Sequence, residues 1–318
     1  MSLAATLTRN LRKLAQADKP TAYRLFELQL KQRIPLSPSM TRLVFTGPDV
    51  GTLRTLAPDQ RVKLLIPAVP GQPLVLPGTG DWRKAVRDLP DAQRPLMRTY
   101  TIRNLRSALG EVDVDFVLHG ETGPASAWAT HAQPGDRLHM AAPNALFTQD
   151  CGGYEWQPPA GMQQVLLIGD ETALPAIAGI LEELARQSVP PQVQAYIEVP
   201  HGLDALQLTC PADAQVVWLP RDTLGLRHGE GMVQAAKGLA SLPTAPASRS
   251  DALPLQEVDI DTQILWELAQ PAGQACYAWV AGESGAVMNI RRYWVGELGL
   301  DRRALTFMGY WREGRALD

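Results

Sequence analysis

A short stretch near residue 100 carries side chains suited to ligand chemistry. The sequence "RTYTIRN", residues 98–104, places Arg98, Tyr100 and Thr101 within four positions. An arginine fork binds two phosphate oxygens at once, and a tyrosine ring packs against flat ring systems. Alternation along a strand puts a charge beside an apolar or hydroxyl group on each face. The stretch therefore predicts a ligand-binding strand, with an ordinary strand and a surface ion pair as the alternative.

A second stretch, "HGETGPASAWA" at 119–129, has the residues of an anion site. Gly and Pro at the start of a short helix leave the amides of Gly123, Ala125 and Ser126 to face an anion, aided by the helix dipole and the serine hydroxyl. His119 stands at the end of the preceding strand. Its side chain is expected either to contact the ligand or to cap the turn. Trp128 is expected to pack inside the fold.

Three further stretches follow late in the chain. "GDETALPA" (169–176) is a strand-to-helix turn without the GxGxxG pattern, in which Thr172 can cap the helix. "WVAGE" (279–283) ends a long strand at the carboxyl edge of a sheet, where α/β proteins bind ligands, so Gly282 and Glu283 are candidates. "GYWREG" (309–314) gathers two flat rings and a cation; its alternative is a terminal strand that packs its aromatic residues.

The elements that must position these residues change in kind near residue 150. Before it, short β-like runs recur between Pro and Gly turns, which predicts a six-stranded antiparallel barrel. The six runs are 23–30, 40–47, 60–67, 98–104, 111–119 and 135–143. In the run 111–119, Val112, Val114, Phe116 and Leu118 share one face, while Asp113 and Asp115 take the other.

After the Gly- and Pro-rich stretch 151–163, strands and helices alternate. Strands are expected at 164–170, 193–199, 214–220, 276–283 and 304–311, with helices at 172–187 and after residue 283. This pattern predicts a parallel sheet with both faces covered. The sequence therefore divides into domains at 1–152 and 153–318, and the segment 242–254 is expected to be an exposed loop.

Bulk properties limit the classes of function. The 318 residues carry a net charge of −3 with dispersed basic residues, which argues against nucleic acid and anionic membranes as partners. No apolar run reaches the roughly 18 residues of a membrane span, and residues 1–17 lack a secretion core, so a leading helix, a cytoplasmic location and a monomer are expected. Cys151, Cys210 and Cys276 are far apart, and no metal-ligand set is evident.

The motifs together resemble one family. "RTYTIRN", "VDFVLHGETGPASAWA", "LLIGDETALPAI", "WVAGE" and "GYWREG" run in order from residue 98 to 314 and are similar to the motif set of the siderophore-interacting proteins. That family comprises FAD-dependent ferric-siderophore reductases related to the ferredoxin reductases. The resemblance implies a Greek-key barrel that binds FAD, then an α/β domain that binds NADPH or NADH, with a C-terminal segment covering the flavin.

The resemblance also implies roles for individual residues. It places near FAD or nicotinamide Arg98, Tyr100, Thr101, Ile102, Arg103, His119, Gly123, Ala125, Ser126, Asp170, Thr172, Ala173, Gly282, Glu283, Tyr310 and Trp311, with Thr172 and Glu283 as catalytic candidates. Lys63 and Arg312 are the candidates for binding the anionic substrate. Many relatives carry a further arginine where this chain has Ala127.

Three functions are compatible with these motifs. The first is NAD(P)H-dependent reduction of a ferric siderophore, since Fe(II) is held far less tightly than Fe(III) by hard oxygen donors. The second keeps the flavin but passes electrons to a quinone, free flavin or ferredoxin; the third is a noncatalytic siderophore carrier. The family resemblance slightly favours NADPH over NADH. A 2′-phosphate would be bound after the second strand of the α/β domain, in "EVPHGLDALQL", where only His201 is basic. Arg221 or Arg227 would then have to bind that phosphate.

Overall fold

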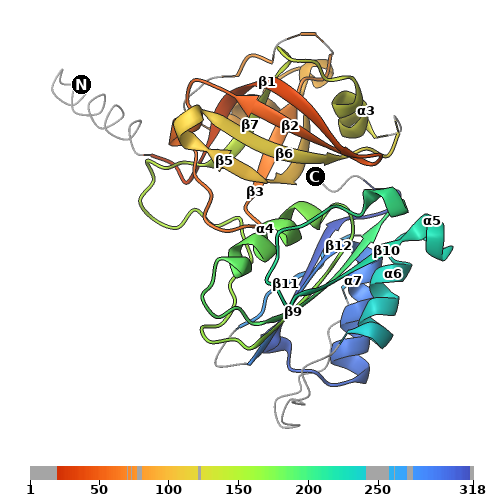
Figure 1. The fold of residues 1–318 in the computed structure, drawn as a ribbon. Helices are drawn as coiled ribbons and strands as arrows, with labels where there is room; N and C mark the ends of the chain where they lie inside the picture. The colour runs from red at the N-terminus through yellow and green to blue at the C-terminus, as the bar shows by residue number, and fades with distance from the viewer. Residues whose placement is uncertain are drawn as a thin grey trace, which may run out of the picture.

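The computed structural model describes residues 20–69, 71–72, 74–76, 81–120, 123–240, 258–260, 262–270 and 275–315. Among these residues, the N-terminal half forms one antiparallel sheet in the order β4-β3-β7-β1-β2-β6-β5, curled into a barrel (Figure 1). Its strands are β1 Tyr23–Ser37, β2 Met40–Thr46, β3 Arg61–Ile66, β4 Leu96–Thr101, β5 Asn104–Arg106, β6 Glu111–Val117 and β7 Arg137–Pro143. Two helices, α2 Trp82–Arg87 and α3 Pro124–His131, and the 3₁₀ turns η1 Val50–Thr52, η2 Asp91–Gln93 and η3 Ser107–Leu109 connect them.

One continuous segment closes this barrel. Its first part, β4, pairs with β3, and the amide of Ile102 then donates to the carbonyl of Gln60 over 2.9 Å. The next amide, of Arg103, donates instead to the carbonyl of Asp113 on β6, also over 2.9 Å, and β5 continues that pairing. The stretch "RTYTIRN" therefore bridges the two edges of the sheet, which leaves fewer unpaired backbone groups there.

The C-terminal half is a second sheet in the order β10-β9-β8-β12-β13-β11. Its strands are β8 Gln164–Gly169, β9 Gln192–Val199, β10 Gln215–Pro220, β11 Trp266–Glu267, β12 Cys276–Glu283 and β13 Leu305–Trp311. All neighbouring pairs run parallel except β11 and β13, so the sheet is mixed, with one antiparallel edge strand that the sequence did not predict.

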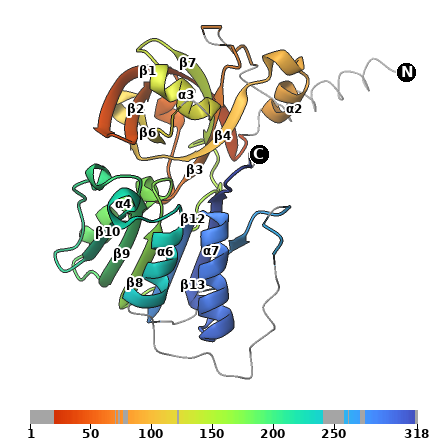
Figure 2. The ribbon, with the colours of Figure 1, turned by 90° about the vertical axis from the view of Figure 1, so that its right-hand side faces the viewer.

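Helices cover both faces of this sheet (Figure 1), and Figure 2 looks onto the face covered by α6 and α7. The helix α4 Leu174–Ala185 packs on one face, and α6 Glu230–Gln234 and α7 Ser284–Arg291 pack on the other. The remaining turns are α5 Arg221–Leu224, η4 Gly202–Asp204 and η8 Arg302–Ala304, with π-helical η5 Ala235–Leu239 and η7 Arg292–Glu297 extending α6 and α7. Two hydrophobic cores thus flank one sheet, each fully buried aliphatic side chain contributing about 1.5 to 3 kcal/mol.

The charged face of β6 is buried rather than solvated. Asp113 is 2% exposed and accepts two hydrogen bonds from Arg106, both 2.6 Å long. Asp115 is 7% exposed and forms the same kind of paired contact with Arg42, at 2.7 and 2.9 Å. The alternation predicted the inward face correctly, but arginines from neighbouring strands cover the other face, because a planar guanidinium fits a carboxylate with two parallel hydrogen bonds.

The two halves are joined by polar contacts at several points. Asp204, in η4, accepts hydrogen bonds from the Ser37 hydroxyl at 2.6 Å and the Ser39 amide at 2.9 Å. Arg103, at the barrel closure, forms an ion pair with Glu182 on α4. Near the connection between the halves, Asp59 accepts the amides of Glu155 and Trp156, at 2.8 and 2.9 Å. These contacts hold the second sheet against the open end of the barrel.

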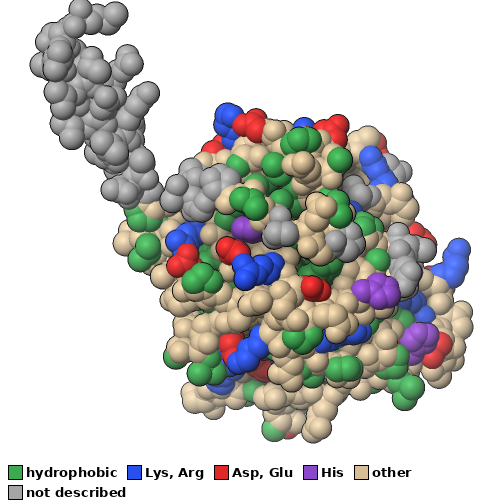
Figure 3. Space-filling model, turned by 90° about the horizontal axis from the view of Figure 1, so that it is seen from above, with side chains coloured by type: hydrophobic (Ala, Val, Ile, Leu, Met, Phe, Trp, Pro, Cys, Tyr) green, Lys and Arg blue, Asp and Glu red, His purple; other side chains and the backbone are tan. Residues whose placement is uncertain are grey.

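All six predicted barrel strands are present, together with the short β5 and longer bounds for β1. The expected helix at the N-terminus and the loop 242–254 lie outside the described residues, and the domain division after residue 152 stays a prediction. In the described part of the chain, no helix is both long and apolar enough to cross a membrane. On the face seen in Figure 3, acidic and basic side chains are interspersed, without one large patch of either sign.

Candidate cofactor cleft

A cleft of about 1370 Å³ is lined by residues of both halves. Its walls come from β3, β4, the end of β6 and the start of α3 on the barrel, and from the carboxyl ends of β8, β9 and β10 with the segment after β13 on the other side. Small-molecule pockets usually measure roughly 300 to 1,000 Å³. The cleft therefore has room for more than one nucleotide-sized group, at the sheet edge where α/β proteins bind ligands.

The barrel wall of the cleft is built on the paired strands β3 and β4. Tyr100 lies with its ring centroid 4.3 Å from that of Phe116, tilted by 36°. Burial raises the pKa of Tyr100, so its hydroxyl remains a hydrogen-bond donor at neutral pH. Beside it, half-buried Arg98 donates to the Met97 carbonyl over 2.8 Å, and the Lys63 ammonium lies 3.5 Å from the Thr99 hydroxyl. This wall combines an aromatic surface with two cations.

The start of α3 forms the adjoining part of the wall. Gly123 is the N-cap residue, and a Cβ there would lie 2.5 Å from the His119 ring, so a larger residue would require that ring to move. The Ser126 hydroxyl donates to the Gly120 carbonyl over 2.8 Å and accepts from the His119 amide over 3.0 Å. Ser126 thus fixes the turn between β6 and the helix, and the helix N-terminus, with its positive dipole end, faces the cleft.

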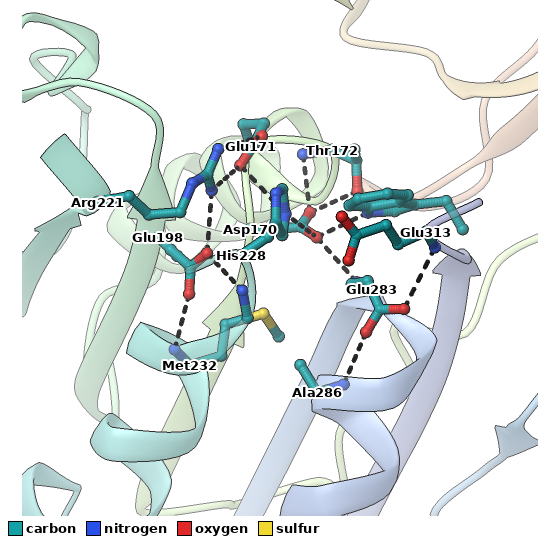
Figure 4. A network of polar contacts seen from close by, with 12 residues as sticks. Asp170, Glu171, Thr172, Glu198, Arg221, His228, Met232, Glu283, Ala286 and Glu313 are labelled. Atoms are coloured by element: carbon teal, nitrogen blue, oxygen red, sulfur yellow. Dashed lines mark hydrogen bonds and ion pairs between the residues drawn. The ribbon is translucent and has the colours of Figure 1, made fainter. Parts of the chain in front are cut away.

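Opposite the barrel, a network of charged residues joins three strand ends (Figure 4). Arg221 donates to Glu171 at 2.8 and 2.9 Å and to Glu198 at 2.9 Å. Glu198 is fully buried and also accepts the amides of Gly229, at 2.7 Å, and Met232, at 3.1 Å. Arg221 therefore neutralises two carboxylates, and Glu198 positions the start of α6.

His228 and Asp170 form the second part of this network. The Nε2 atom of His228 lies 3.5 Å from Asp170 Oδ2 and 3.8 Å from Glu171 Oε2. Asp170 also accepts the Thr172 amide at 2.9 Å, the Thr172 hydroxyl at 2.5 Å and the Trp311 indole at 2.8 Å. These partners fix the conformation of the β8–α4 turn.

The charges shift the pKa values of these groups in opposite directions. Burial works against a charged His228, but the Asp170 contact and the charge of Glu171 outweigh it and raise the pKa of the imidazole. Burial likewise favours neutral Asp170, yet the nearby imidazole of His228 and its charge, with hydrogen bonds from Thr172 and Trp311, lower the pKa of that carboxyl. Burial raises the pKa of Glu171, with Arg221 opposing the shift. Each of the two groups, His228 and Asp170, therefore stabilises the charged form of the other.

The end of β13 supplies the remaining wall. Trp311 lies edge-on to His228, with ring centroids 4.6 Å apart, and Arg312 donates to Glu283 over 2.8 Å. The Tyr310 ring stacks on Trp266 at 6.0 Å and 15°. Its hydroxyl is buried in the described part of the chain without a protein hydrogen-bond partner, and it lies on the cleft wall. A buried hydroxyl of this kind is suited to a polar ligand atom.

The structure brings most of the predicted site residues to this cleft. Those on its wall are Lys63, Arg98, Tyr100, Thr101, His119, Gly123, Ala125, Ser126, Thr172, Tyr310, Trp311 and Arg312. Those that do not line it are Ile102, Arg103, Asp170, Ala173, Gly282 and Glu283. Ile102 packs in the barrel core, and Ala173 packs in the core under α4.

The other predicted residues that do not line the cleft support its walls. Arg103 is held in its ion pair with Glu182. Glu283 caps α7 by accepting the Ala286 amide at 2.9 Å, and it also holds Arg312. A Cβ on Gly282, whose φ is +151°, would lie 2.7 Å from Asp170 Oδ2. Only glycine therefore lets β12 approach the Asp170 turn so closely.

Sequence reasoning missed His228 and Trp266, which both line the cleft. Neither belongs to a recognisable motif: His228 lies between α5 and α6, and Trp266 lies on the short edge strand β11. Arg221 was considered only for a 2′-phosphate, whereas the structure pairs it with Glu171 and Glu198. No pattern in the sequence could indicate which carboxylates it would meet.

These residues fit the FAD that the sequence motifs imply. The barrel wall offers Tyr100 for a flat ring, Arg98 for a phosphate and the α3 N-terminus for a second anionic oxygen. The unpartnered Tyr310 hydroxyl adds a polar contact across the cleft. The cleft exceeds the usual volume of a small-molecule pocket, which leaves room for a second ligand beside the flavin.

Comparison with known proteins gives two family matches. The model described as the siderophore-interacting FAD-binding domain matches residues 29–147, and that described as the siderophore-interacting protein matches residues 162–314. A protein of Mycobacterium tuberculosis is 36% identical over 231 residues, covering 72% of this chain and 69% of its own. The ferric vibriobactin reductase ViuB of Vibrio cholerae is 26% identical, covering 88% and 86%. A siderophore utilization protein from T. fusca has a similar structure, with a TM-score of 0.68, 28% identity and 94% and 97% of the two chains covered.

Proposed function

Because the chain belongs to the siderophore-interacting protein family, we propose that it reduces ferric siderophores with electrons from NAD(P)H, through a bound FAD. The reaction balances as one NAD(P)H and two Fe(III) giving NAD(P)⁺, two Fe(II) and one proton. Iron leaves because its oxygen donors hold Fe(II) much less tightly. The iron chelate is the substrate, and the protein needs no metal ligands of its own.

One observation carries the proposal: the residues proposed for a flavin and those proposed for a nicotinamide nucleotide line the same cleft. A carrier would need a pocket for the chelate alone. Here the barrel presents Tyr100 and Arg98, while Thr172 lies across the cleft at the turn into α4. This arrangement supports a redox enzyme over a noncatalytic binder. The relative ViuB, named as a ferric vibriobactin reductase, agrees with that chemistry.

Bound FAD would accept a hydride from nicotinamide and pass single electrons to iron. The chain's own part is binding and orientation: Arg98 and the α3 N-terminus hold phosphates, and Tyr100 packs against the flavin ring system. Trp311 is held by Asp170, so its ring has a fixed place at the cleft wall. Asp170 and Glu283 act from beneath the wall as positioning residues, through Thr172 and Arg312.

The anionic chelate requires cations at the cleft mouth. Lys63 lies on the barrel side and Arg312 on the opposite side, and Arg83 and Arg315 also line the cleft. Lys63→Ala should raise KM for the ferric chelate about fivefold, the value of one partly exposed charge pair, and leave FAD content unchanged. Lys84→Ala is the matched control, because Lys84 pairs with Asp88 on the exposed face of α2.

An anaerobic assay tests the proposal directly. Protein loaded with FAD is mixed with NADH or NADPH, then with a ferric siderophore and a ferrous-iron trap, while flavin absorbance and trapped Fe(II) are followed together. We expect the flavin to bleach, then to recover as two Fe(II) form per nucleotide. Bleaching without Fe(II) would favour another acceptor such as a quinone or ferredoxin. Purified protein without any capacity for FAD would refute the proposal.

A further inference from the structure

The cleft is bordered by carboxylates where it meets the carboxyl ends of β8, β9 and β10. It is lined there by His201, Arg221 and His228, which follow the ends of β9 and β10. In nucleotide-binding α/β domains the adenosine ribose lies near the end of the second strand, here β9. An acidic residue at that place accepts the 2′-hydroxyl of NADH, whereas a free arginine accommodates the 2′-phosphate of NADPH. The charges around these three residues therefore bear on the choice of donor.

His201 faces a carboxylate directly. Its Nδ1 atom lies 3.3 Å from Asp222 Oδ2, and Asp222 Oδ1 accepts the Gly202 amide at 3.1 Å. Asp222 is 45% exposed at this end of the sheet. Although burial acts to raise it, the hydrogen bonds from Thr223 and His201 lower the pKa of Asp222 overall. A negative charge thus stands beside the one basic residue that follows β9.

Arg221 is held by two buried carboxylates. Its guanidinium bridges Glu171, whose side chain is 6% exposed, and Glu198, whose side chain is fully buried. Turning it toward a 2′-phosphate would leave two buried carboxylates without their cation, which is strongly unfavourable. His228 likewise lies between Asp170 and Glu171. Four carboxylates therefore face one guanidinium and two histidines.

Arg227, the other candidate for a 2′-phosphate, pairs with Glu230 and is 89% exposed. It is not among the residues that line the cleft. Asp222 is likewise not a lining residue, but it contacts His201, which lines the cleft. From these contacts we infer that the cleft selects NADH over NADPH, with Asp222, beside His201, as the discriminating carboxylate. This inference rests on the proposed function and names its electron donor, and it reverses the slight preference suggested by family resemblance. The neutral 2′-hydroxyl donates to a carboxylate, whereas a phosphate adds about 1.5 to 2 negative charges.

Two measurements test the selection in the wild-type protein. The first is anaerobic stopped-flow reduction of the FAD-loaded protein, for which we expect kcat/KM with NADH to exceed that with NADPH by at least about 100-fold, since facing like charges are strongly unfavourable. The second needs no redox step: calorimetric titration of the same protein with 5′-AMP and with 2′,5′-ADP, which differ by the 2′-phosphate. We expect 5′-AMP to bind more tightly.

Variants assign the effect to particular residues. Asp222→Asn should lower the NADH-to-NADPH ratio by about tenfold, the effect of one charge. His201→Lys adds a cation at the same end of the cleft and should lower the ratio as well, which keeps the test open if Asp222→Asn fails to fold. Asp213→Asn is the matched control, since Asp213 is exposed and precedes β10, at the opposite end of that strand from Asp222. It should leave the ratio unchanged.

The outcomes separate this inference from the proposed function. Equal or faster reduction by NADPH, or tighter binding of 2′,5′-ADP, would overturn the selection while leaving a nicotinamide-dependent reductase intact. An unchanged ratio in both Asp222→Asn and His201→Lys would overturn the assignment to this end of the cleft. Failure of both nucleotides to reduce bound FAD would instead refute the donor in the proposed function, and this inference with it.

Discussion

Replacing Arg221 by methionine removes the only guanidinium that bridges Glu171 and Glu198 in the described structure. The side chains of Glu171 and Glu198 are 6% and 0% exposed, so neither carboxylate can recover water in place of the lost cation. Breaking a buried pair by removing one partner costs about 3 to 5 kcal/mol. Arg221 makes three hydrogen bonds to the two carboxylates, so we expect a loss near the upper end of that range at pH 8.

The loss should depend on pH with a defined sign. The pKa of Glu171 is already raised by burial, and Arg221 is the partner that opposes this shift. Without the guanidinium, Glu171 will take up a proton more readily, and protonation removes part of the buried charge. The destabilisation should therefore be smaller at pH 5.5 than at pH 8, by about 1.4 kcal/mol for each further unit of pKa shift.

Urea unfolding of flavin-free protein at the two pH values measures this effect, followed by tryptophan fluorescence. Arg227→Met is the matched control, since Arg227 is 89% exposed and pairs with Glu230 at the surface. It should change the free energy of unfolding by no more than about 0.5 kcal/mol. A loss below about 1 kcal/mol for Arg221→Met at pH 8, or an equal loss at both pH values, would refute this account of the network.

Three further predictions follow from the same structure. Arg98→Ala and Tyr100→Ala should each weaken FAD binding by about 10- to 100-fold, the value of a charge-assisted hydrogen bond or a ring contact. The control is Arg137→Ala, at an exposed residue. Unchanged flavin content in both variants would contradict the proposal that the barrel wall binds FAD. Because the folded pKa of His228 is raised, its stabilisation is fully present below its ordinary value near 6.5 and is lost as the pH rises through the folded value. Wild-type stability should accordingly fall relative to His228→Gln in urea titrations above pH 6.5, and parallel curves would exclude this role. Burial raises the pKa of Asp59 to about 6, so the native state loses stability as the pH rises from about 4 to 6. Asp59→Asn should therefore be more stable than wild type at pH 8 by about 1 to 3 kcal/mol. A less stable variant in thermal or urea unfolding would show that the folded protein favours the charged form of Asp59.

Much of the fold and part of the site follow from local sequence patterns. The alternation in β6 identified Val112, Val114 and Phe116 as core residues, and each is fully buried. The run at 276–283 matches β12 residue for residue. Such patterns are readable because strand periodicity and the apolar requirement of a core act over neighbouring residues. Side-chain chemistry and the motif resemblance pointed to Arg98, Tyr100 and Gly123, which lie on the cleft wall.

Other features depend on residues that only the folded chain brings together. The sequence shows an aspartate at 170 and a histidine at 228, but their separation of 3.5 Å follows from the packing of α6 against the ends of β8 and β9. In the same way Asp113 and Asp115 look like solvent-facing residues until arginines from other strands cover them. Local patterns show the type of each side chain and the spacing of apolar residues. The partners of a side chain, its burial and hence its charge state are set by long-range packing. The sequence alone therefore predicted the two architectures and the motifs of a flavin-binding family. The tertiary structure decided which of those residues face the cleft and which carboxylates lie near the end proposed for the nucleotide.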